Sequence, residues 1–133
     1  MQYIIMLTIV LGLALSDFVT GIIKGYVKND LNSKKMRKGG LNKLCEIIVM
    51  ATACGLEIGI HYLGKYYSAD ELAGVTGAIT AIAVFIYIVL MEIISILENY
   101  ADINPDSAGW ISKILKKLKA WNKEENHNDE ERH

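Results

Sequence analysis

Proline and aromatic residues are scarce in this 133-residue chain, which contains one proline and 8% aromatic residues. β-sandwiches and barrels need many turns, and repeat arrays need a recurring unit. With one proline, few aromatic residues and no low-complexity tract in its apolar runs, the composition favours an all-α fold. The length suits one domain.

Cysteine is also rare, and the two thiols, Cys45 and Cys54, are nine positions apart. On a helix with about 3.6 residues per turn they point to opposite sides, so they cannot pair with each other. We expect both to be buried and to behave as small apolar side chains.

Enzyme motifs are missing as well. Outside the apolar runs there is no nucleophile beside a base, no glycine-rich phosphate loop and no cluster with metal-ligand spacing. We therefore predict a protein that is not an enzyme, with no cofactor and no metal site.

Long apolar runs are the main feature present, since 52% of the residues are hydrophobic. Three runs, 3–23, 44–63 and 75–97, reach the roughly 20 residues that a helix needs to cross about 30 Å of hydrocarbon. We predict an all-α integral membrane protein with three transmembrane helices. The first run lacks the basic start of a signal peptide. Its uninterrupted part, 3–15, is short, so a re-entrant helix or a break near Ser16-Asp17 stays open.

Basic residues gather between the first two runs and after the third, whereas the link between the second and third runs has more acids than lysines. The positive-inside rule then places the N-terminus outside and the C-terminus in the cytoplasm. Anionic lipid is the nearest partner for these charges, and no nucleic-acid binding is expected. The basic residues assigned to the membrane surface are Lys34, Lys35, Arg37, Lys38, Lys113, Lys116 and Lys117.

Several ionisable residues interrupt the apolar runs, and each charged acid near the bilayer centre costs about 3 kcal/mol. We expect them to face other helices or a water-filled space rather than lipid. Helical spacing gives each run one polar edge. The edges comprise Asp17 and Thr20 in the first run; Glu46, Glu57 and His61, on a stripe with Met50 and Ala53, in the second; and Glu92, Ser95, Glu98 and Asn99 in the third. His61 and Glu46 lie near run ends, where a purely interfacial role stays open.

Small residues recur at four-residue spacing, which allows close backbone approach between helices in a membrane. They predict helix packing without naming the partner. The positions are Gly21 and Gly25, Gly55 and Gly59, and the series Ala73, Gly77 and Ala81.

The C-terminal part has two sections. Residues 101–121, in which Pro105 suits a first helical turn, predict an amphipathic interfacial helix with tryptophans on one side and lysines on the other. A helix that binds a soluble partner is the alternative. Residues 122–133 are almost entirely polar and charged and are predicted to be disordered.

Three short motifs in order give a family resemblance. "DFVTGIIKG" from Asp17, "SKKMRKGGLNKL" from Ser33 and "EIISILEN" from Glu92, followed by Pro105 and a basic helix, resemble the phage lysis and toxin-secretion holins of Gram-positive bacteria and their phages. The matching positions are Asp17, Thr20 and Gly21; Ser33, Lys34, Gly39, Gly40 and Lys43; and Glu92, Ser95, Ile96, Glu98 and Asn99.

The resemblance implies a protein that forms homo-oligomers in the bacterial cytoplasmic membrane. There it would open lesions that collapse the membrane potential and release an endolysin or a toxin, contributing to host cell lysis. Three packed helices enclose no lumen, so a hole of that size would need many copies, and gathering copies would also hide the acidic edges. Two alternatives are a narrow ion or proton channel and a non-conducting anchor subunit that recruits a soluble partner.

Overall fold

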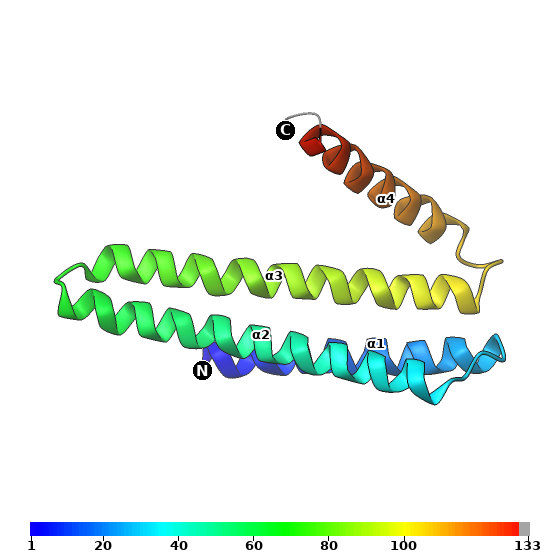
Figure 1. Ribbon diagram of the computed structural model, residues 1–133, viewed down its shortest axis with the longest axis horizontal. Coiled ribbons are helices and arrows are strands. Elements are labelled where there is room, and N and C mark those ends of the chain that lie inside the picture. The colour runs from blue at the N-terminus through cyan, green and yellow to red at the C-terminus, as the bar shows by residue number, and fades with distance from the viewer. Residues whose placement is uncertain (131–133) are drawn as a thin grey trace.

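The computed structural model describes the backbone of residues 1–130 and the side chains of residues 1–120. Over that range the chain is helical, in the order α1 (Gln2–Val27), α2 (Ser33–Tyr66), α3 (Asp70–Ile103) and α4 (Gly109–Glu130). The helices α1, α2 and α3 lie side by side as an antiparallel bundle, from which α4 diverges (Figure 1). These three helices are long and apolar enough to cross a membrane, which confirms the predicted fold class.

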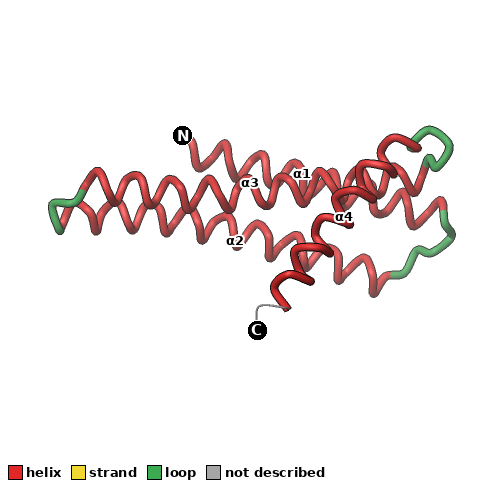
Figure 2. Tube along the Cα trace, turned by 90° about the horizontal axis from the view of Figure 1, so that it is seen from above, coloured by secondary structure: helices red, strands yellow, loops and turns green. Residues whose placement is uncertain are grey.

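The hairpin of α2 and α3 is longer than α1. At about 1.5 Å per residue, the 34-residue helices α2 and α3 each extend about 51 Å, and the 26-residue α1 extends about 39 Å. The N-terminus therefore lies partway along the hairpin, whose tip projects beyond it (Figure 2). All three helices exceed the roughly 30 Å of hydrocarbon, so their ends extend into the interfaces.

Helix boundaries differ from the apolar runs because polar residues also form helix here. The side chain of Asn32 accepts a hydrogen bond from the Lys34 amide at 2.9 Å and starts α2 at Ser33, so the basic stretch is helical rather than a loop. The helix α3 continues to Ile103 and stops before Asn104-Pro105, where proline disfavours helix in the residue before it.

The structure decides the open question of a break in α1 and shows where α4 begins and ends. No break occurs at Ser16-Asp17: the Ser16 hydroxyl donates to the Gly12 carbonyl within a continuous α1. Pro105 lies in a turn, and α4 begins four residues later, at Gly109. With no glycine or proline after Gly109, α4 continues through Glu130, into the segment predicted to be disordered; residues 131–133 lie outside the described part.

The core of the bundle is small. Val10, Met50, Cys54 and Ile88 form its buried centre, where α1, α2 and α3 meet. Cys54 is buried as expected, but Cys45 is exposed, because it faces away from the other helices.

Apolar side chains cover most of the outer surface of the bundle. Ile9 and Leu15 of α1, Ile48 and Leu56 of α2, and Ile86 of α3 are each 41–56% exposed, and many similar residues accompany them. Only 17–22% of the residues in the apolar window of each long helix are buried. Such a surface is unfavourable in water and favourable against lipid tails or further apolar helices.

The small-residue positions separate into two groups. A Cβ atom added at Gly77 would lie 3.2 Å from the Glu57 carbonyl oxygen, and Ala81 is fully buried, so this part of α3 packs closely on α2. Near the hairpin tip, Gly64 similarly approaches Ala73. By contrast, Gly55 and Gly59 have open space where a side chain would stand.

Candidate functional site: an ion cluster between the three long helices

Lys43 is the centre of a buried cluster of charged groups. Its ammonium lies 2.7 Å from Oδ2 of Asp17 on α1 and 2.5 Å from Oε1 of Glu92 on α3. Glu46, one turn further along α2, is 3.3 Å away. One lysine thus contacts a carboxylate from each long helix and joins all three.

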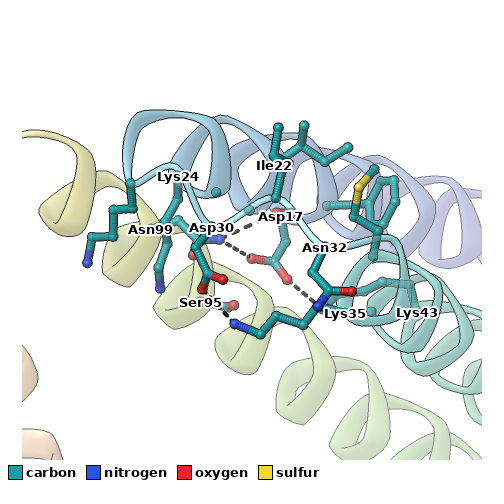
Figure 3. Close-up of a pocket in the computed structure, with 16 residues that line it drawn as sticks. Asp17, Ile22, Lys24, Asp30, Asn32, Lys35, Lys43, Ser95 and Asn99 are labelled. Carbon is teal, nitrogen blue, oxygen red and sulfur yellow. Dashed lines mark hydrogen bonds and ion pairs between the residues drawn. The ribbon is translucent and has the colours of Figure 1, made fainter.

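Asn99 extends the cluster by one layer. Its side-chain amide donates to Asp17 Oδ1 at 2.9 Å and to Thr20 Oγ1 at 3.1 Å, and the Thr20 hydroxyl donates to the Asp17 carbonyl at 3.0 Å. Gly21 faces Asn99, and an added Cβ there would lie 3.7 Å from its amide nitrogen. Figure 3 shows Asp17 between Lys43 and Asn99, with contacts drawn to both.

Burial makes these contacts energetically important. Asp17 is 7% and Glu92 1% exposed, and the Lys43 side chain is 18% exposed. Removing one partner of such a buried pair typically costs about 3–5 kcal/mol, because the remaining charge is left without compensation. The acidic positions therefore face inward within a single chain, and no second copy is needed to cover them.

A second polar contact lies toward the hairpin tip. Gln2 of α1 donates to Glu57 Oε1 at 3.2 Å, and Glu57 is buried against Gly77. Gln2 and Asp17 are 15 positions apart on α1, so this contact lies about 22 Å along the helix from the Lys43 cluster. In a hydrocarbon core of about 30 Å, both layers can lie near a boundary rather than at the centre, where charge is most costly.

Five exposed tyrosines lie beyond the two layers, as in the aromatic belts of membrane proteins, whereas Tyr87 is exposed between the layers. Tyr62, Tyr66 and Tyr67 are 67%, 82% and 69% exposed near the hairpin tip. Tyr26 and Tyr100 are exposed at the opposite end. Their positions support a membrane that covers the bundle between these two sets.

The predicted polar edge of α2 is only partly turned inward. Glu57 is buried with Met50 and Ala53, and Glu46 is partly buried at the Lys43 cluster. His61 is exposed, since four residues advance a helix by about 40° more than a full turn. His61 therefore lies outside the inward-facing stripe.

The end of the bundle near the α1–α2 loop carries further ion pairs. Lys24 and Lys28 approach Asp102 at 2.7 and 3.4 Å, and Lys35 pairs with Asp30 at 2.5 Å. The hydrogen bond from Lys24, helped by the charge of Lys28, holds the pKa of Asp102 below its ordinary value. Lys35 lowers the pKa of Asp30 in the same way.

A cavity of about 460 Å³ lies between this loop and the ion cluster. Asp17, Lys43 and Asn99 line its inner part, and the exposed pair of Asp30 and Lys35 lies at its outer part (Figure 3). The cavity therefore leads from the loop end of the bundle to the buried charges.

The helix α4 packs on the end of α3. Ala108, Ile111 and Leu115 are buried against α3, and the Lys119 ammonium pairs with Glu98 at 2.8 Å, which raises the pKa of Lys119. Over residues 109–120, whose side chains are described, the remaining surface of α4 is amphipathic. It exposes Trp110, Ile114 and Leu118 together with Lys113, Lys116 and Lys117.

The sequence marks Lys43 only as a matching position of the family resemblance and not as part of a polar edge. It lies three residues before Glu46 and seven before the buried Met50, on one face of α2, and this spacing is the signal that points to it. Asp102 and Gln2 were missed as well, because their partners lie on other helices.

Among the described residues there is no group of three His, Cys, Asp or Glu side chains arranged to hold a metal ion. Within the cluster, the lysine ammonium already supplies the positive charge among the three carboxylates.

A family model described as the bacteriophage holin family matches residues 2–120, which include the three long helices and about the first half of α4. Neither the curated proteins nor the solved structures contain a match.

Proposed function

This chain belongs to the bacteriophage holin family as a multi-pass membrane protein, and we propose that it assembles with copies of itself and opens lesions in the bacterial cytoplasmic membrane. The lesions would depolarise the membrane and release an endolysin or a toxin, which contributes to host cell lysis.

One observation carries the proposal of self-assembly. The buried acids Asp17, Glu57 and Glu92 have polar partners inside one bundle, whereas the outer surface is apolar. A single bundle of this kind offers no polar path for a large solute. A hole that passes a folded protein would have to form between many chains, with lipid-facing surfaces turned toward other copies.

The placement in the membrane follows from the charges and aromatic residues. We place the α1–α2 loop and α4 on the cytoplasmic side, because lysine and arginine are concentrated there, and the hairpin tip outside. The exposed lysines of α4, together with Trp110, suit a surface of anionic lipid.

The ion cluster has a structural role in this proposal. Lys43 holds α1, α2 and α3 as one unit before assembly, so that single copies accumulate without exposing charge to lipid. If the helices separate when a lesion opens, the same acids become groups that can face water.

The experiment is inducible expression in bacteria, with membrane potential and release of a cytoplasmic reporter enzyme recorded together. Joint loss of potential and of the reporter, at one sharp time, supports the proposal. Loss of potential with the reporter retained would indicate a narrow ion channel instead. An intact potential at full membrane abundance would indicate a non-conducting anchor.

A further inference from the structure

One oxygen atom of the ion cluster has no partner. Glu92 is 1% exposed, and its Oε2 is buried without a hydrogen-bond donor, the only such side-chain atom found among the described residues. Buried polar atoms in folded proteins are nearly always satisfied, so this oxygen requires an explanation.

Lys43 cannot supply the missing donor. An ammonium group has three N–H donors, and those of Lys43 face Asp17 Oδ2, Glu92 Oε1 and the Glu46 carboxylate. Asn99 donates to Asp17 and Thr20 rather than to Glu92. No other charged donor from α1, α2 or α3 contacts Glu92 among the described residues.

The charge balance of the cluster also indicates that a further proton is bound there. Three carboxylates surround one ammonium, which leaves two excess negative charges if all are ionised. The carboxylates of Glu46 and Glu92 lie 3.3 and 2.5 Å from the same ammonium nitrogen of Lys43, so they are close neighbours. Two carboxylates this close in a poorly solvated site are rarely both charged.

We infer that the cluster is a proton-binding site, in which a proton on Glu92 Oε2 is donated to the carboxylate of Glu46. The bound proton supplies the missing donor and removes one of the two excess charges. Glu46 is the suitable acceptor, because its side chain is about one-third exposed and keeps part of its hydration.

The cavity of the α1–α2 loop end reaches the cluster at Lys43 and at Ser95, one turn from Glu92, but neither Glu92 nor Glu46 lines it. The partly exposed Glu46 side chain gives the shared proton its contact with solvent. This inference concerns a single chain and does not depend on lesion formation.

Infrared spectroscopy of the full chain in lipid bilayers tests the inference. A protonated carboxyl group has a carbonyl band that is separate from carboxylate bands and shifts in D₂O. We expect this band in the wild type at neutral pH, and its loss in Glu92→Gln. Glu46→Gln should also lose it, since the new amide donates to Glu92 Oε2 and replaces the proton. Asp30→Asn, an exposed acid, should keep it.

Two results would overturn the inference: a wild type with no deuterium-sensitive carboxyl band, or a band that persists unchanged in Glu92→Gln. Loss of the band in Glu92→Gln but not in Glu46→Gln would overturn the sharing with Glu46. If Glu92→Gln does not fold, the partly exposed Glu46→Gln variant and the wild-type spectrum decide the question.

Discussion

The Asn99 amide on α3 donates to the Asp17 carboxylate on α1 across 82 residues of sequence, at 2.9 Å. Lys43 occupies the other oxygen of the same carboxylate at 2.7 Å. Asp17 is thus bound from α2 and α3 at once, which explains how an apolar helix retains an aspartate.

The first prediction concerns Lys43. Lys43→Met would leave three neighbouring carboxylates without their cation, and we expect a loss of about 3–5 kcal/mol in the free energy of unfolding. Unfolding in detergent micelles, followed by circular dichroism, measures the change. The exposed Lys34, on the first turn of α2, provides the control: Lys34→Met should change stability by less than about 0.5 kcal/mol. Equal stability of the two variants would contradict the assigned role of Lys43.

A second prediction links the cluster to lysis. Asp17→Leu removes the acceptor of both Asn99 and Lys43, so the bundle becomes looser while membrane insertion is retained. We expect an earlier onset of lysis than in the wild type at equal membrane abundance. The control is Ser16→Leu, which alters the exposed neighbouring residue of α1. Unchanged timing in Asp17→Leu would separate the cluster from lesion formation.

A third prediction uses two glycines with different surroundings. Gly77→Val would force methyl groups into the contact with Glu57, and we expect a loss of about 1–3 kcal/mol. Gly55→Val adds the same atoms in open space and should leave the stability of the single chain nearly unchanged. Thermal unfolding of both variants in dilute micelles makes the comparison. A larger loss in Gly55→Val would show that α2 packs through its other face.

The fourth prediction concerns acid. Lys24 lowers the pKa of Asp102 from its ordinary value of 3.8, so this pair stabilises the fold at pH values above that value. The contribution is lost as pH falls through the lowered pKa. Since the Asp102 side chain is 42% exposed, we expect less than about 1 kcal/mol. Asp102→Asn should therefore lower the unfolding temperature slightly at neutral pH and not in strong acid. An equal effect at both pH values would contradict the pairing.

The sequence was sufficient to predict the helical class and the three apolar helices, because hydropathy over about 20 residues depends only on local composition. It did not predict the helix ends, because Ser33 and Ile103 lie beyond the apolar runs. The start of α2 is set by the Asn32 cap, and the end of α3 by Pro105, which disfavours helix in the residue before it. The prediction of disorder for 122–133 rests on composition; the structure describes helix as far as Glu130, and residues 131–133 lie outside the described part.

Helical periodicity does not predict which side chains of the site pair with each other, because it carries no information on how the helices lie against one another. Spacing identified Asp17, Glu92 and Asn99 as inward-facing, but their pairing requires the relative shift of α1 against α3. Lys43 was overlooked because a lysine beside an apolar run suggests an interface. Assembly of many copies is not needed to shield these acids from lipid, because Lys43 forms ion pairs with three of them within one chain.

The most direct test of lesion formation uses purified protein in lipid vesicles loaded with cargo of graded size, from a small dye to a folded enzyme. Our account predicts that dye and enzyme escape together once the density of the protein in the membrane passes a threshold. Release of the dye with permanent retention of the enzyme, or no release at any density, would contradict it.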